Sequence, residues 1–226
     1  MQIKPRPTVD RGDHMTNARV KICGLTTEAA FDAAVAAGAD WVGFVFFPPS
    51  PRFITPTRAA SLIARAPDGP PRVGLFVDPT DAMIAEVLET VPLDVLQING
   101  AIDPAALRAR FGRTIWRATG VSLATDLPRE MRDADALLID AKPPKTATRP
   151  GGNAVPFDWG IMRGWTAPGP WLLAGGLTAA NVGDAIRRTS APAVDVSSGV
   201  ESAPGVKDPE LIRAFVSAVR RLSPSP

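Results

Sequence analysis

The sequence predicts an α/β protein that folds as a single (β/α)8 TIM barrel, and three observations support this. Eight short apolar runs of strand-forming residues recur along the 226 residues, alanine-rich stretches separate them, and no shift of composition marks a second domain. Strands that alternate with helices pair in parallel through crossovers, and eight such units suit a closed barrel of this length. An open doubly wound sheet is the alternative, but no GxGxxG motif follows the first run.

The expected strands are the apolar runs 19–23, 41–46, 72–77, 95–98, 114–119, 136–140, 171–174 and 193–196. Helix start signals lie between several of them. Thr55, Asp78, Asp103 and Asp208 each precede a proline, so that a capping side chain comes just before a proline at the first helical position. Gly38 is expected to end the first helix in the left-handed conformation.

A single cysteine and a single histidine exclude several classes of function. One cysteine forms no internal disulfide and builds no multi-cysteine metal site, which fits a reducing cytoplasm. The histidine, His14, lies in a polar leader, so neither a Ser/His/Asp triad nor a multi-histidine metal site is expected. We expect residues 1–18 to form a disordered extension, 19–222 the catalytic barrel and 223–226 a loose tail.

The charge and hydropathy of the sequence limit the kinds of partner that we expect the protein to bind. No run reaches the roughly 18 apolar residues of a membrane span. The net charge is +2, and the basic residues are scattered without aromatic residues between them, which argues against nucleic acid. Nothing indicates an obligate protein partner. We therefore expect a cytoplasmic protein that acts on a small molecule.

Residues at the carboxyl ends of the strands become the candidates for chemistry, because the active site of such a barrel lies there. In the first run, Val20 and Ile22 are expected to face the helices, which turns Cys23 toward the barrel axis. The same alternation turns Asp140 inward at the end of the sixth run. A thiol and a carboxyl thus meet at one mouth, which is the minimum for moving a proton between two atoms.

The last two strands end in small residues that suit a phosphate. LLAGGLT (172–178) contains Gly175 and Gly176, and VDVSSGV (194–200) contains Ser197, Ser198 and Gly199. Bare backbone amides at such positions approach an oxyanion closely, and the loops after strands seven and eight are the usual phosphate site of this fold. We expect these five residues to bind a phosphate group.

The motifs KICGLT (21–26), SPRF (50–53), FDW (157–159), LAGGL (173–177) and DVSSGVE (195–201), followed by PGVKD, occur in this order along the chain. In order and spacing the sequence resembles the phosphoribosylanthranilate isomerase family of tryptophan biosynthesis, over about residues 19–221. The resemblance implies a barrel of the ribulose-phosphate-binding type. It also implies an Amadori rearrangement of a phosphoribosyl aldose to the 1-deoxyribulose phosphate, with no cofactor and no metal.

The resemblance also implies residue roles. Cys23 would be the general base that takes the proton from C2 of the sugar, and Asp140 the general acid that protonates the ring oxygen. Such a division is expected to need opposite pKa shifts, with cationic neighbours lowering that of the thiol and burial raising that of the carboxyl. Arg52, in the turn after the second strand, would bind the anthranilate carboxylate as a bidentate fork.

Two charged residues are expected to face the barrel interior. Lys21 and Asp195 lie on strands that become neighbours when the barrel closes, so we expect them to pair, with Arg117 as a third partner if register allows. The family implies a ligand contact for Asp195 as well. Gln97 and Asn99 are further expected ligand contacts; Asn99 stands where the family has a histidine, and an amide carries no proton.

The stretch 141–156 is long for a connection without secondary structure, which is typical of a lid, although simple surface disorder fits it too. Three other functions stay open. A histidine-pathway sugar isomerase shares fold and reaction type but commonly has aspartate where Cys23 stands. A thiol enzyme with a covalent intermediate lacks a histidine to activate it. A barrel that only binds a phosphorylated ligand or regulates a partner is the third.

Overall fold

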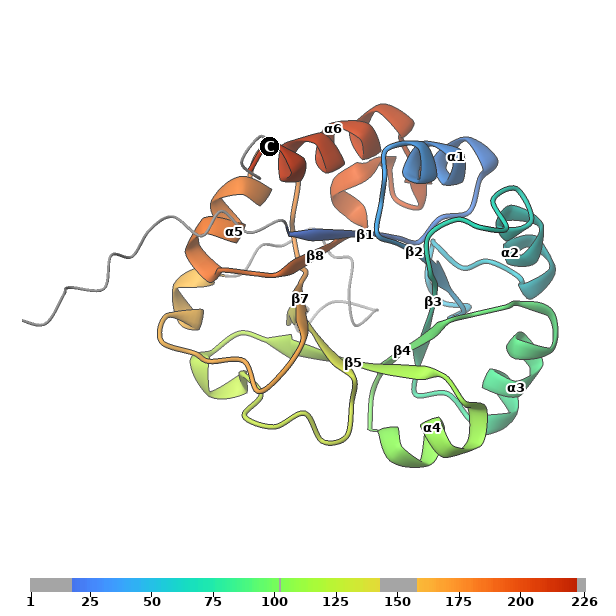
Figure 1. Ribbon diagram of the computed structural model, residues 1–226, viewed down its shortest axis with the longest axis horizontal. Helices are drawn as coiled ribbons and strands as arrows, with labels where there is room; N and C mark the ends of the chain where they lie inside the picture. Colours follow the sequence, from blue (N-terminus) through green and yellow to red (C-terminus); the bar gives the residue numbers. More distant parts are fainter. Residues whose placement is uncertain (1–17, 102, 143–157, 223–226) are drawn as a thin grey trace, which may run out of the picture.

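The computed structural model describes residues 18–101, 103–142 and 158–222. Eight parallel strands, each hydrogen-bonded to the next along the chain, close into a barrel in which β1 pairs with β8, and the helices lie outside it (Figure 1). This confirms the predicted (β/α)8 barrel. The expected extension, tail and lid fall wholly or largely outside the described residues.

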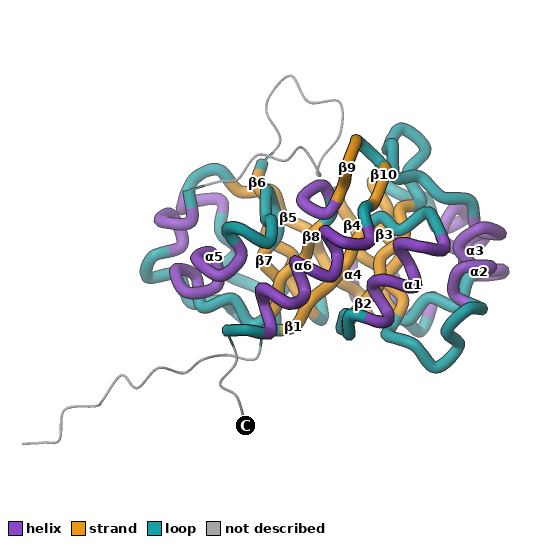
Figure 2. Tube along the Cα trace, turned by 90° about the horizontal axis from the view of Figure 1, so that it is seen from above, coloured by secondary structure: helices purple, strands orange, loops and turns teal. Residues whose placement is uncertain are grey.

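The barrel strands are β1 (Arg19–Cys23), β2 (Trp41–Val45), β3 (Arg72–Val77), β4 (Val95–Asn99), β5 (Thr114–Val121), β6 (Ala136–Ala141), β7 (Trp171–Leu173) and β8 (Ala193–Val196). Each overlaps one of the eight predicted runs. The chain then adds a small antiparallel hairpin, β9 (Glu201–Ala203) and β10 (Val206–Lys207), which rises at one end of the barrel (Figure 2).

The helices are α1 (Glu28–Ala36), α2 (Pro56–Ile63), α3 (Asp81–Thr90), α4 (Pro104–Phe111), α5 (Val182–Thr189) and α6 (Pro209–Arg220). Short 3-10 turns are η1 (Ala124–Asp126), η2 (Trp159–Met162) and η3 (Ser198–Val200). Among the described residues, β5 and β6 are followed by η1 and η2 in place of full helices. In the residues that the structure describes, the outer layer beside these strands is therefore built mainly from loop.

Three of the four predicted helix starts are confirmed, because Thr55, Asp103 and Asp208 accept backbone N–H bonds as caps. The prediction at Asp78 was wrong, since helix α3 is capped by Thr80 two residues later. The backbone N–H of Asp78 donates to the carbonyl of Asn99 at 2.9 Å, so Asp78 extends the pairing of β3 with β4 at the carboxyl end of β3. Gly38 adopts φ +77° after α1, as predicted.

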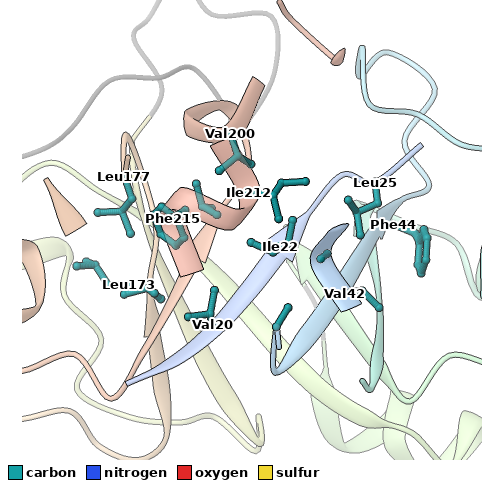
Figure 3. Close-up of a cluster of buried hydrophobic side chains, with 14 of the residues drawn as sticks. Val20, Ile22, Leu25, Val42, Phe44, Leu173, Leu177, Val200, Ile212 and Phe215 are labelled. Atoms are coloured by element: carbon teal, nitrogen blue, oxygen red, sulfur yellow. The ribbon is translucent and has the colours of Figure 1, made fainter. Parts of the chain in front are cut away.

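Two layers of apolar side chains hold the strands in place. Alternate strand residues point outward and pack between strands and helices, as Figure 3 shows for Val20 and Ile22 of β1, and Phe215 of α6 belongs to the same cluster. The others point into the barrel. There, a second cluster fills the end at which the strands begin, with Trp41, Val73, Val95, Trp116, Ala136, Leu172 and Ala193. The rings of Trp41 and Trp116 meet edge to face at 5.2 Å.

The alternation predicted for β1 and β6 is confirmed. Val20, Ile22, Leu137 and Ile139 belong to the outer cluster. Their sequence neighbours therefore face the interior. In the described part of the chain, no helix is long and apolar enough to cross a membrane.

Candidate active site

Cys23 ends β1 and Asp140 lies near the end of β6, so two different strands bring a thiol and a carboxyl to the same mouth of the barrel. Cys23 is buried, with 3% of its surface exposed. Glycines make room for both groups: a Cβ on Gly43 would lie 3.1 Å from the Cys23 sulfur, and one on Gly175 would lie 2.8 Å from Asp140 Oδ1. The backbone thus approaches both side chains so closely that a Cβ at either glycine would crowd them.

A buried ion pair interacts electrostatically with both of these groups. Lys21 Nζ donates to Asp195 Oδ1 at 2.8 Å, and the two residues are directly opposite each other where β1 meets β8. This confirms the predicted pairing. The third partner suggested for it was wrong: Arg117 donates from Nη2 to the carbonyl of Glu130 at 3.1 Å, outside the barrel. The reason is that Trp116 points inward, which turns its neighbour outward.

The pair acts on the pKa of both candidate groups. Burial, then the charge of Asp195, raises the pKa of Asp140 to about 7, against the opposing effects of the Ala141 N–H and of Lys21. Burial also raises the pKa of the Cys23 thiol, and Lys21 offsets only part of that rise. The expected opposite shifts are therefore not found, because loss of water outweighs the cation beside the sulfur.

Arg52 is buried in the turn after β2, with 4% of its surface exposed. Its Nε and Nη2 donate to the two carboxylate oxygens of Glu201 at 2.6 and 2.8 Å, a bidentate geometry that fixes the plane of the guanidinium. A Cβ on Gly24 would lie 2.8 Å from Arg52 Cδ, so the loop after β1 packs directly on this side chain. Sequence analysis did not identify Glu201 as the partner, although it lies within the DVSSGVE motif.

Lys207, in the PGVKD motif, was also missed. Its side chain is fully buried, and Nζ donates to Glu201 Oε1 at 2.5 Å, to the Ser197 carbonyl at 3.0 Å and to Ser197 Oγ at 3.2 Å. Burial lowers the pKa of Lys207, although Glu201 opposes that effect. In the sequence, the only indication of a role for Lys207 was its position just after a tight turn.

The loops after β7 and β8 lie against each other. A Cβ on Gly199 would lie 1.8 Å from the carbonyl oxygen of Leu177, so only glycine fits this contact. Ser197 Oγ donates to the carbonyl of Cys23 at 3.2 Å, and Asn181 Nδ2 donates to the carbonyl of Gly176 at 2.9 Å. The structure thus gathers the predicted phosphate-binding residues, including Gly175 and Ser198, at the mouth that holds the thiol.

Two amide side chains occupy β4. Gln97 is buried, with 2% of its surface exposed, and its Oε1 has no hydrogen-bond partner among the described residues. Asn99 follows it on the same side of the strand and lies half-buried at the end of β4. Within the described ranges, no group of three or more His, Cys, Asp or Glu side chains is placed to hold a metal ion.

Comparison with known proteins agrees with this geometry. Residues 20–218 match the family model described as N-(5'phosphoribosyl)anthranilate (PRA) isomerase. The isomerase of that name from Acidiphilium cryptum is 59% identical over 204 residues, which cover 89% of this chain and 98% of the relative. The one from Paramagnetospirillum magneticum is 55% identical over 207 residues, 89% of this chain and 96% of the relative.

Comparison with solved structures indicates the same family. The phosphoribosyl anthranilate isomerase of Thermotoga maritima superposes with a TM-score of 0.79 at 35% identity, over 90% of this chain and 99% of the other. A phosphoribosyl anthranilate isomerase in complex with reduced 1-(o-carboxyphenylamino)-1-deoxyribulose 5-phosphate gives 0.77 at 34% identity, with the same coverage. The chain therefore belongs to the N-(5'-phosphoribosyl)anthranilate isomerase family.

Proposed function

We propose that the chain converts N-(5-phosphoribosyl)anthranilate to 1-(2-carboxyphenylamino)-1-deoxyribulose 5-phosphate, with Cys23 as general base and Asp140 as general acid. The observation that supports these roles is the placement of both groups beside the buried Lys21–Asp195 pair at one mouth of the barrel. Family membership supports the substrate, which fits the tryptophan pathway.

The reaction needs two proton positions. Asp140 gives its proton to the ring oxygen of the sugar, the bond from C1 to that oxygen breaks, and a Schiff base forms between C1 and the nitrogen. The Cys23 thiolate then removes the proton from C2, which leaves an enolamine. The Cys23 thiol then gives its proton to C1 while the Asp140 carboxylate accepts the proton of the C2 hydroxyl, so the ketone forms and both side chains return to their starting states.

The electrostatics support this division of roles. A carboxyl with a pKa of about 7 keeps its proton in a large fraction of molecules at neutral pH and releases it readily, as a general acid must. The thiol, in contrast, rests mainly protonated because burial raises its pKa. The cation of Lys21 offsets part of that cost, so the small thiolate fraction is stabilised where the proton is removed.

The binding residues are also proposals. Arg52 receives the anthranilate carboxylate, supported by a guanidinium whose plane Glu201 fixes. The phosphate binds to the loops after β7 and β8, through Gly175, Gly176, Ser197, Ser198 and Gly199. Gln97, Asn99 and Asp195 contact the sugar from the barrel interior. The absence of a nucleic-acid, membrane or obligate protein partner and the cytoplasmic location stay predictions from the sequence.

Conversion of phosphoribosylanthranilate by the purified protein tests the proposal. We expect Cys23→Ala and Asp140→Asn each to lower kcat/KM by about a hundredfold or more, because each removes a proton-transfer group. Asp184→Asn, on the exposed face of α5, is the matched control and should change little. Full activity in the Cys23→Ala protein contradicts the assigned base. Turnover of the histidine-pathway sugar in place of this substrate favours the alternative isomerase.

A further inference from the structure

Lys207 is the charged residue at this mouth to which the reaction above gives no role. It ends β10, and all three donors of its ammonium group are used: on Glu201, on the Ser197 carbonyl and on Ser197 Oγ. Burying an ammonium group is costly unless it is paired and hydrogen-bonded, as this one is. Such complete pairing indicates that the group fixes the geometry around it.

The hydrogen bonds of this ammonium group connect it to two other parts of the site. Through Ser197, whose Oγ accepts from Lys207 and donates to the Cys23 carbonyl, it reaches the residue that carries the thiol. Through Glu201, which also binds Arg52, it reaches the turn after β2. The hairpin β9–β10 thereby ties the loop after β8 to the ends of two other strands.

We propose that Lys207 is a positioning residue, which holds the loop after β8 against the end of β1 and so fixes where the Cys23 thiol meets the substrate. The catalytic part of this inference rests on the proposed function of Cys23. The structural part does not, because the contacts of Lys207 exist whatever the substrate is.

The charges around Cys23 predict a signature that a purely structural role would not give. Burial raises the pKa of the thiol, Lys21 on β1 lowers it, Asp195 on β8 raises it and Lys207 on β10 lowers it. Asp140, Arg52 and Glu201 are further charged groups at this mouth. Loss of the Lys207 cation should therefore make the thiolate form at a higher pH.

The sequence makes this signature simple to measure. Cys23 is the only cysteine and the chain contains no tyrosine, so the ultraviolet absorbance of thiolate reports on one group without a tyrosinate background. Lys207→Met removes both charge and hydrogen bonds, whereas Lys207→Gln removes the charge but keeps a donor for Ser197. Arg213→Met, which removes a cation from an exposed pair on α6, is the matched control.

We expect both Lys207 variants to raise the titration midpoint of Cys23 by about half a pH unit or more. Lys207→Met should also lower kcat/KM by about tenfold or more, and Lys207→Gln by less. The control should change neither quantity. If Lys207→Met does not fold, Lys207→Gln carries the test.

An unshifted midpoint together with unchanged kcat/KM in a folded Lys207 variant overturns the inference. Failure of the wild-type protein to turn over phosphoribosylanthranilate is a different result, because it contradicts the proposed function and leaves the titration to decide the role of Lys207.

Discussion

Among the described carboxyl groups, Asp140 is unusual because its surroundings work against ionisation. It lies at the mouth of the barrel, near the carboxylate of Asp195, and only the Ala141 N–H and the cation of Lys21 favour its charged form. The acid and the base of this site therefore titrate in an unusual order, with the acid near pH 7 and the thiol above its ordinary value. The reactive form, with thiolate and carboxylic acid together, is a minor one at every pH.

This order predicts the pH dependence of kcat/KM. Below about pH 7, Asp140 stays protonated and the thiolate fraction grows, so kcat/KM should rise by about tenfold per pH unit. Above about pH 7, the loss of protonated Asp140 cancels further gain of thiolate, and the profile should level off. It should fall only when Cys23 itself has titrated.

The comparison with Asp140→Asn isolates this effect. The asparagine variant has no acid to lose, so its residual kcat/KM should keep rising through pH 7. The substrate phosphate titrates near pH 6 in assays of both proteins, so their ratio removes its contribution. A wild-type profile that falls between pH 7 and 8 contradicts the assignment of acid and base.

Individual residues also show where sequence reasoning reached its limit. Cys23, Asp140 and the Lys21–Asp195 pair followed from strand alternation, which fixes direction once a strand is located. Glu201 and Lys207 did not, because their partners lie in a distant turn and a loop that only the folded chain brings near. The suggested position of Arg117 failed for a related reason: a single step along a strand reverses the side on which a residue points.

At the scale of elements, the strands were predicted more accurately than their connections. All eight runs are apolar and short, and burial on both faces gives such strands a clear pattern. The connection from β5 to β6 carries many polar residues, and Arg132 and Asp133 both adopt positive φ there. Such a segment favours turns, which is why η1 replaces the helix that simple alternation of strands and helices predicts.

The contact between the loops after β7 and β8 gives a prediction for these elements. Gly199→Ala places a methyl group against the carbonyl of Leu177, so the two loops must separate. If both bind the phosphate, KM should rise by about tenfold or more, while kcat changes less, because phosphate binding serves substrate and transition state alike. Steady-state kinetics at fixed pH measures both constants.

The control for this change is Gly183→Ala on α5, where the added methyl group would meet side chains at 3.4 Å or more. We expect its kinetic constants to match those of the wild type. An unchanged KM in folded Gly199→Ala protein would place the phosphate elsewhere.

At the scale of the whole molecule, the barrel closes at the seam between β1 and β8, and the Lys21–Asp195 pair bridges this seam. Replacing one partner leaves the other charge buried without its counter-ion. Lys21→Met or Asp195→Asn should therefore lower the free energy of unfolding by about 3–5 kcal/mol. The double variant should lose less than the sum of the two, because neither charge remains.

Urea unfolding of the four proteins in this cycle measures the coupling between the two residues. The exposed Arg213–Glu210 pair on α6 gives a parallel cycle in which little coupling is expected. Additive losses at Lys21 and Asp195 would mean that the pair does not stabilise the closed barrel.

The tryptophan-lined end of the barrel determines where substrate can enter and product can leave. Trp41 and Trp116 lie edge to face across it, the guanidinium of Arg19 covers Trp41 at 4.4 Å, and five smaller apolar side chains complete the floor. This packed end leaves no passage for a molecule the size of a sugar. Substrate must therefore enter, and product leave, at the opposite end of the barrel, so each turnover begins only after the previous product has dissociated.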